Sequence, residues 1–377
     1  MPAQTAHAVL PIANHDEQSR QDFAQAMRRV VAGDMAGNQR VVLERSVIPR
    51  IRRAGKRAPR DRHEIETAFK REPYYQTWSA LQRITQEMMW DSVGESIERQ
   101  LPALVSSAKK TTGADGSLTL DPALPMPRYI EAVDIHVMPG NFQSEIVADD
   151  VYAGALYDRG VYLYLMGSVG GCNEGLGLMA TGYLKKAFPD FRPRLILDLG
   201  CSVGHSTLPY VDAYPKAAVT GLDVAAPQLR YAHARAESLG RTVHYVQGDA
   251  CATRYPDGHF DLIVSHLLLH EMPLKLIRQM FRECRRLLAP GGMMLHFDGP
   301  EMAQLEPFDQ FMLHWYDHNN NEPFSAKSHD MSFVAEALAA GFGRDEVLLH
   351  GESSAFLQEQ VPLNGMRIAF KGRAAPK

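Results

Sequence analysis

The chain of 377 residues lacks the features that mark secreted, membrane-spanning or strongly charged proteins. Its four cysteines form no C-x-x-C pair and no cysteine–histidine spacing typical of zinc. No run of about 18 apolar residues is present, so no segment is expected to span a bilayer. The first residues lack the basic start and long apolar core of a signal peptide. We therefore expect a cytoplasmic protein with free thiols at Cys172, Cys201, Cys251 and Cys284.

The chain also has no large excess of positive or negative charge, since its formal net charge is only −4. Attraction of the whole molecule to nucleic acid or to an anionic membrane is therefore not expected. Residues 40–71 are a local exception, with eleven Lys or Arg against four Asp or Glu. Such a segment can contact RNA, DNA, an anionic substrate or a partner subunit. We favour a solvated helix face whose charges pair with acids elsewhere, and expect neither a nucleic-acid nor a membrane partner.

Patterning changes near residue 150. Before this point apolar residues recur at three- and four-residue spacing around 23–31 and 81–97, which predicts amphipathic helices. Residues 101–128 are rich in Pro, Gly, Ser and Thr, which is typical of a long loop or linker. We predict a helical domain over 1–150, which covers the substrate or forms a homodimer, and a second domain over 151–377.

The second domain alternates short β-rich runs with helical ones, which predicts a parallel α/β sheet with helices on both faces. Two further runs, separated only by a loop, predict an antiparallel pair at the C-terminal end. Together they give a Rossmann-like, mostly parallel sheet of seven strands beside the helical domain. The predicted strands cover residues 195–199, 218–223, 243–247, 260–265, 293–297, 345–349 and 365–370.

The loop after the first of these strands, Gly-Cys-Ser-Val-Gly at 200–204, has two interpretations. As G-x-S-x-G it is a nucleophile elbow, with Ser202 as nucleophile and Asp298 and His314 as partners. An elbow, however, follows several strands and an oxyanion loop, and neither precedes residue 200. A glycine turn that binds a nucleotide cofactor fits better, because Asp223 ends the next strand and can accept ribose hydroxyls.

Five elements occur in a fixed order: 195-LILDLGCSVG-204, 221-GLDVA-225, 247-QGDA-250, 259-HFDLIVSHLLLHEMP-273 and 287-LLAPGGMMLHFD-298. This order resembles the class I S-adenosylmethionine-dependent methyltransferases over about residues 150–377, with Ser202 in place of the family's middle glycine. The resemblance implies S-adenosylmethionine as cofactor. It implies cofactor contacts at Asp198, Gly200, Cys201, Ser202, Gly204, Asp223, Val224, Asp249, Ala250 and Ser265. The simpler alternatives are a helix cap for Asp223 and a turn for Asp249.

His270 follows the fourth strand, in a segment similar to I-L-H-D-W of plant-type O-methyltransferases. The resemblance implies a small-molecule acceptor, with a hydroxyl oxygen favoured and His270 as its base. Packing or substrate contact is the alternative for His270. A nucleic-acid or protein methyltransferase acting through residues 40–71, and a non-catalytic cofactor-binding module, also remain open.

The insertion 311–330 covers the acceptor pocket in this family, which implies substrate contacts at His314, Trp315 and Asn320. A polar exposed loop is the alternative. His314 and His318 share one helix face, yet we expect no metal site. Before the first strand, 167-GSVGGCNEG-175 and four tyrosines could cover the cofactor, although such aromatics also suit a core. The tyrosines are Tyr152, Tyr157, Tyr162 and Tyr164.

Overall fold

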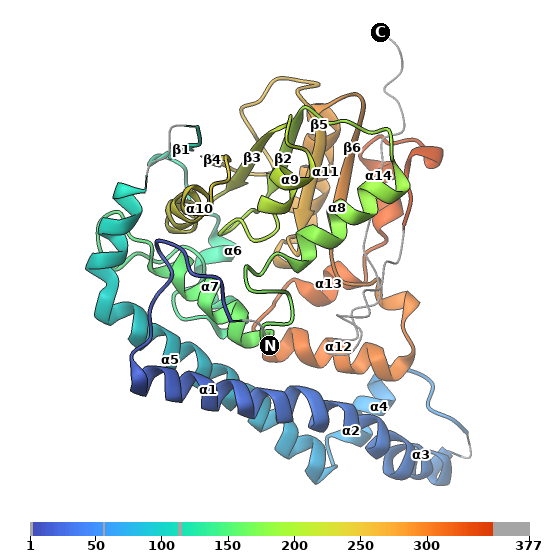
Figure 1. Ribbon diagram of the computed structural model, residues 1–377. Coiled ribbons are helices and arrows are strands. Elements are labelled where there is room, and N and C mark those ends of the chain that lie inside the picture. The colour runs from blue at the N-terminus through green and yellow to red at the C-terminus, as the bar shows by residue number, and fades with distance from the viewer. Residues whose placement is uncertain (1–2, 56, 112–114, 350–377) are drawn as a thin grey trace.

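The computed structural model describes residues 3–55, 57–111 and 115–349 (Figure 1). A twisted sheet with its flanking helices forms one part, and a layer of long N-terminal helices lies beneath it. In the described part, no helix is both long and apolar enough to cross a membrane. The four cysteines are free.

The sheet has six described strands in the order β1-β4-β3-β2-β5-β6, and every neighbouring pair is parallel. Parallel strands end at the same edge, so the loops after β2, β3, β4 and β5 meet there, where ligands bind in open α/β sheets. The strands are β1 (Ser117–Thr119), β2 (Leu195–Leu199), β3 (Ala218–Asp223), β4 (His244–Gln247), β5 (Phe260–His266) and β6 (Leu288–Phe297).

The five central strands and the crossover helices are confirmed, but seven strands are not. Residues 344–346 form a 3-10 turn and 347–349 no strand, so the strand predicted at 345–349 is wrong. The strand predicted at 365–370 lies outside the described residues. The sixth strand is instead β1, from the stretch expected to be a loop, where Leu118 pairs with Tyr245 of β4.

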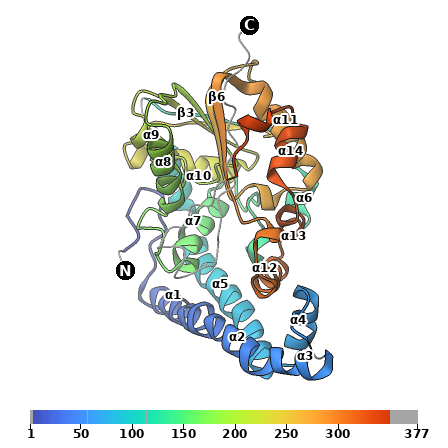
Figure 2. The same cartoon turned by 90° about the vertical axis from the view of Figure 1, so that its right-hand side faces the viewer.

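Helices cover both faces of the sheet, as predicted (Figure 2). Buried side chains of one group of helices pack on one face, and those of the other group pack on the opposite face. The sheet core is therefore closed on both sides, which suits its continuous apolar strands. The first group is α8 (Gly175–Ala187), α9 (Leu208–Ala213) and α10 (Ala226–Ser238), and the second is α11 (Leu274–Leu287) and α14 (Phe333–Ala339).

The N-terminal layer is helical, as its periodicity predicts. The 38-residue helix α5 runs past Pro102 to Lys110, so the expected loop begins about ten residues late. Helix α7 (Tyr152–Tyr164) packs between α5 and α10 and joins this layer to the sheet. Besides α7, the helices of this N-terminal layer are α1 (His15–Arg28), η1 (Arg29–Met35), α2 (Ala36–Val42), η2 (Leu43–Val47), α3 (Ile48–Gly55), α4 (Arg62–Phe69) and α5 (Pro73–Lys110).

Between the N-terminal layer and the sheet lies α12 (Pro307–Asn319), followed by α13 (Ser325–His329). The rings of Trp315 and Trp78 pack against each other with an interplanar angle of 39° and centroids 4.1 Å apart. This contact anchors α12 on α5.

The division into two domains at residue 150 and the homodimer remain predictions. On the N-terminal layer, Phe23 of α1 is 56% exposed and Ile84 of α5 is 51% exposed.

Close packing of α7 on α5 gives a stability prediction. A Cβ at Gly160 would lie 2.0 Å from Cζ3 of Trp90, and that ring is buried. We expect Gly160→Ala to destabilise the protein by about 1–3 kcal/mol in chemical denaturation. Gly182→Ala on α8 is the matched control, because its Cβ meets nothing within 4 Å. Equal stability of the two variants would contradict this packing.

Candidate active site

The glycine loop after β2 turns in the left-handed region of backbone space, with φ of 67° at Gly200, 48° at Ser202 and 79° at Gly204. The Gly200 amide donates to the Leu222 carbonyl at 2.8 Å, and the Ser202 amide donates to Oδ2 of Asp223 at 2.9 Å. The loop is thereby fixed against the end of β3. The Ser202 hydroxyl donates to Gln228 and faces no histidine base in these contacts, so nothing here supports a nucleophile elbow.

Asp198, at the end of β2, is buried, and only one of its two carboxylate oxygens accepts a hydrogen bond. Its Oδ2 accepts a hydrogen bond from the Thr207 hydroxyl at 2.6 Å. Its Oδ1 has no hydrogen-bond partner, and Nδ1 of His266 lies 3.6 Å away. A buried carboxylate oxygen without a partner is costly, so a ligand that brings a cationic or N–H group fits this position.

At the end of β3, each carboxylate oxygen of Asp223 accepts a hydrogen bond from a backbone amide. Oδ2 accepts from Ser202, and Oδ1 accepts from the Ala225 amide at 2.9 Å, just before α10. Burial raises the pKa of Asp223 above its ordinary value. Each oxygen keeps a second lone pair, so Asp223 can accept hydrogen bonds from these backbone amides and from ligand hydroxyls at the same time.

Two cavities lie along this edge of the sheet, which we call cavity 1 (about 150 Å³) and cavity 2 (about 170 Å³). They share Gly200, Ser202 and Tyr157, so they adjoin each other at the glycine loop. Of the predicted cofactor residues, Asp223, Val224, Asp249 and Ala250 line cavity 1, whereas Asp198 and Cys201 line cavity 2. The side chain of Asp249 also closes its own turn by accepting from the Cys251 amide at 2.8 Å.

Cavity 3, of about 220 Å³, lies between α12, η1 and the segment after α7. Asn320 lines it, as predicted for a substrate residue. Leu267 lines all three cavities, His270 lines cavities 1 and 3, and Tyr164 lines cavities 2 and 3. Cavity 3 therefore adjoins the other two at the end of β5.

Four predicted site residues do not line any of these three cavities. Ser265 is buried and pairs with Nδ1 of His296 at 2.8 Å, inside the sheet. A Cβ at Gly204 would lie 2.3 Å from the Tyr245 hydroxyl, so packing explains that glycine. Trp315 donates to Ser79 and belongs to the core, and His314 lies beside Arg62 and Glu66.

Sequence reasoning missed the face of α12 that lines cavity 3. Its members recur at three- and four-residue spacing, so helical periodicity could have found them. Residues between β1 and β2 were also missed, because no local signal marks them. The α12 residues are Asp309, Met312, Leu313, Tyr316 and Asp317, and the earlier ones are Tyr129, His136 and Phe142. Of the four tyrosines, Tyr157 and Tyr164 line cavities, whereas Tyr152 and Tyr162 are core.

His270 lies in η4 (Leu269–Glu271), directly after β5. Its Nδ1 is 2.9 Å from Oδ1 of Asp298, and its Nε2 is 3.5 Å from Oε1 of Glu271. Burial alone would lower the pKa of His270, but the two carboxylates outweigh it and hold this pKa well above its ordinary value. The orientation of the ring is therefore set by Asp298.

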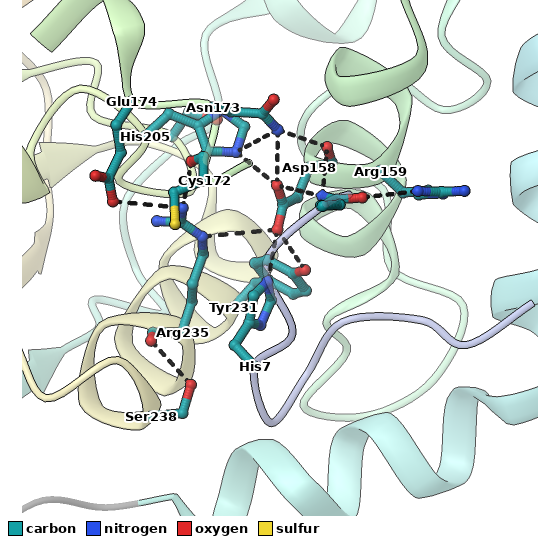
Figure 3. A network of polar contacts seen from close by, with 12 residues as sticks. His7, Asp158, Arg159, Cys172, Asn173, Glu174, His205, Tyr231, Arg235 and Ser238 are labelled. Atoms are coloured by element: carbon teal, nitrogen blue, oxygen red, sulfur yellow. Dashed lines mark hydrogen bonds and ion pairs between the residues drawn. The ribbon is translucent and has the colours of Figure 1, made fainter. Parts of the chain in front are cut away.

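Behind the cavities, Asp158 of α7 is the centre of a buried polar network (Figure 3). It accepts from Tyr231 at 2.8 Å, and His205 and His7 lie within 2.7 and 2.9 Å. Arg235 lies 3.6 Å away. Burial alone would raise the pKa of Asp158, but the interactions with His205, His7 and Arg235 hold it well below its ordinary value. His205 in turn stacks on the Tyr157 ring that lines cavities 1 and 2.

The match to known families falls on this edge of the sheet. Residues 196–292 match the family model described as "Methyltransferase domain". This segment is a methyltransferase domain. The motif order from Asp198 to Asp298 resembles that of the class I methyltransferases, which use S-adenosylmethionine as cofactor. The unpartnered oxygen of Asp198 and the free lone pairs of Asp223 fit such a cofactor, which carries an amino group and ribose hydroxyls.

Similar proteins include several methyltransferases. Demethylmenaquinone methyltransferase of Thermus thermophilus is 33% identical over 108 residues, covering 29% of this chain and 48% of that protein. Malonyl-[acyl-carrier protein] O-methyltransferase of Halorhodospira halophila is 34% identical over 171 residues, covering 43% and 52%. This chain thus spans about half the length of these curated relatives.

Among solved structures, phosphoethanolamine N-methyltransferase 2 of Haemonchus contortus, in complex with S-adenosyl-L-methionine, is also similar. It is 20% identical with a TM-score of 0.36, and the match covers 52% of this chain and 43% of that one.

The buried network gives a prediction for the methyltransferase domain and the helices on it. Asp158→Asn removes the charge that faces buried Arg235, and we expect a loss of about 3–5 kcal/mol in unfolding free energy. Asp257→Asn is the control, because Asp257 is 81% exposed and pairs with Arg286 at the surface. The measurement is urea denaturation followed by circular dichroism. Similar losses in both variants would contradict a central role for Asp158.

Proposed function

We propose that the protein transfers the methyl group of S-adenosylmethionine to a hydroxyl oxygen of a small molecule bound in cavity 3. The observation that carries this proposal is the junction of cavity 3 with cavities 1 and 2 at Leu267 and His270. A cofactor along the sheet edge and an acceptor beneath α12 would meet there. Methyl transfer depends on such alignment and on exclusion of water.

The cofactor's place follows from the residues at the strand ends. Asp223 would accept its ribose hydroxyls in cavity 1, and Oδ1 of Asp198 would accept from its amino group in cavity 2. When bound, the cofactor supplies a methyl group on a positively charged sulfur. The chain supplies the position of that sulfur relative to the acceptor.

The proposed acceptor site is cavity 3, to which α12 contributes five lining residues, more than any other element. Met312 and Leu313 offer an apolar surface, and Tyr316 and Asn320 offer polar groups for orientation. Arg28, Asp309 and Glu322 also line cavity 3, so it suits a small organic molecule that carries polar groups beside an apolar part. Oxygen is favoured because one similar protein is named as an O-methyltransferase and because His270 lies at the junction.

The basic segment 40–71 gives little support to a nucleic-acid substrate. Most of its charges are paired with carboxylates, as expected for a solvated helix face, and paired charges contribute less to phosphate binding. The pairs are Arg40–Asp309, Arg50–Glu72, Arg57–Glu64, Arg60–Glu64, Arg62–Asp330 and Lys70–Glu66.

The test is transfer of labelled methyl groups from S-adenosylmethionine into a cell extract fractionated into small molecules, RNA and protein. We expect label among small molecules and none in RNA. Asp223→Ala should lower cofactor affinity by tenfold or more in calorimetry and abolish transfer, because it removes the acceptor of the ribose hydroxyls. Asp257→Ala should retain both.

Label that enters only RNA or protein would contradict the small-molecule proposal. Unchanged cofactor affinity in Asp223→Ala would remove Asp223 from the cofactor site.

A further inference from the structure

Two histidines and a glutamate converge at the junction of the three cavities. His136, in η3 (Ile135–Val137), has its Nε2 2.8 Å from Oε1 of Glu271. The Nε2 of His270 lies 3.5 Å from the same oxygen. One ligand atom from each residue lies within 4.8 Å of the other two. Two imidazoles and one carboxylate are a ligand set that suits divalent transition-metal ions.

The other nitrogen of each histidine also faces a carboxylate. Nδ1 of His136 is 3.0 Å from Glu322, and Nδ1 of His270 is 2.9 Å from Asp298. Metal-binding histidines almost always donate their second ring N–H to such a group, which fixes the tautomer and the ring. Here this arrangement aims both Nε2 atoms at Glu271.

Glu271 itself is incompletely satisfied. Its Oε2 is buried and has no hydrogen-bond partner. His136 is held with φ of 56°, a sparsely populated conformation for a residue other than glycine. Its carbonyl accepts from the side chains of Gln86 and Trp90, which fix this backbone. The strained residue thus presents its ring to Glu271 because α5 holds it there.

The charges at this position are unbalanced. Glu271, Glu322 and Asp298 face two imidazoles, so the carboxylates exceed the positive charges even when both rings are protonated. Among the described residues that line cavities 1 and 2, none is Lys or Arg, and Arg28 lines cavity 3. A divalent cation would supply the missing positive charge.

We propose that His136, His270 and Glu271 bind a divalent transition-metal ion at the junction, where its open positions face the acceptor. Resting on the proposed function, the cation would bind the acceptor oxygen and weaken its O–H bond. The proton passes to water, and the oxyanion that remains is stabilised by the cation. His270 then acts on the acceptor through the cation instead of as a base.

The test uses the full chain without a polyhistidine tag, freed of metal by a chelator and titrated with Co²⁺ and Zn²⁺. We expect one ion per chain, with visible absorption bands for Co²⁺. His136→Ala should abolish stoichiometric binding, and Glu271→Gln should weaken it by at least tenfold. Glu322→Gln leaves all three ligands in place and should weaken it by 10- to 100-fold, in line with the effect of losing the orienting carboxylate.

His15→Ala is the matched control, because His15 is 93% exposed on α1 beside Asp16. Thermal unfolding verifies that each variant is folded. The proposal is overturned when the wild type binds neither ion at equimolar concentration, or when His136→Ala and Glu271→Gln bind as tightly as the wild type.

The binding measurement needs neither cofactor nor acceptor, so its result is separate from that of the methyl-transfer assay. Stoichiometric binding without methyl transfer would support the metal site and contradict the proposed function. Full methyl transfer by the metal-free protein would overturn the cation's role in the reaction.

Discussion

The buried carboxylate of Asp158 connects parts of the chain that are far apart in sequence. Its partners are His7 of the N-terminal segment and His205 of the loop after β2. Tyr231 and Arg235 of α10 complete the set. A buried charge is tolerated only when its partners surround it. The N-terminal segment, α7 and the sheet are therefore held in one arrangement, and the walls of cavity 2 depend on it.

Two layers with different tasks meet at the site. The sheet supplies the ends of β2, β3 and β5, which carry Asp198, Asp223 and His270. Most residues that line cavity 3, including those of α12, lie outside the segment that matches the methyltransferase domain, whereas Leu267 and His270 lie inside it. Under the proposed function, the acceptor therefore contacts mainly residues outside the matched segment. This division explains how one cofactor-binding fold can serve different acceptors.

Much of the fold and part of the site follow from the sequence. The five central strands and their crossover helices carry strong local periodicity, and Asp198, Asp223, Val224, Asp249 and Ala250 occupy positions set by the strand ends. Strand β1 was missed because three residues at a sheet edge carry no pattern distinct from a loop. Trp315 and His314 were expected at the acceptor, yet α12 turns them toward α5 and α4, which only tertiary packing decides. His136 lies far from His270 and Glu271 in sequence, so its contact with Glu271 had no local signal at all.

The proposed function requires that cofactor and acceptor meet where the three cavities join. A crystal structure of the protein with S-adenosylhomocysteine would show whether they do. We expect the ribose hydroxyls at Asp223, the amino group at Asp198, and the sulfur facing Leu267 and His270 beside cavity 3. A product bound elsewhere, or with its sulfur directed away from this junction, would contradict the proposed function.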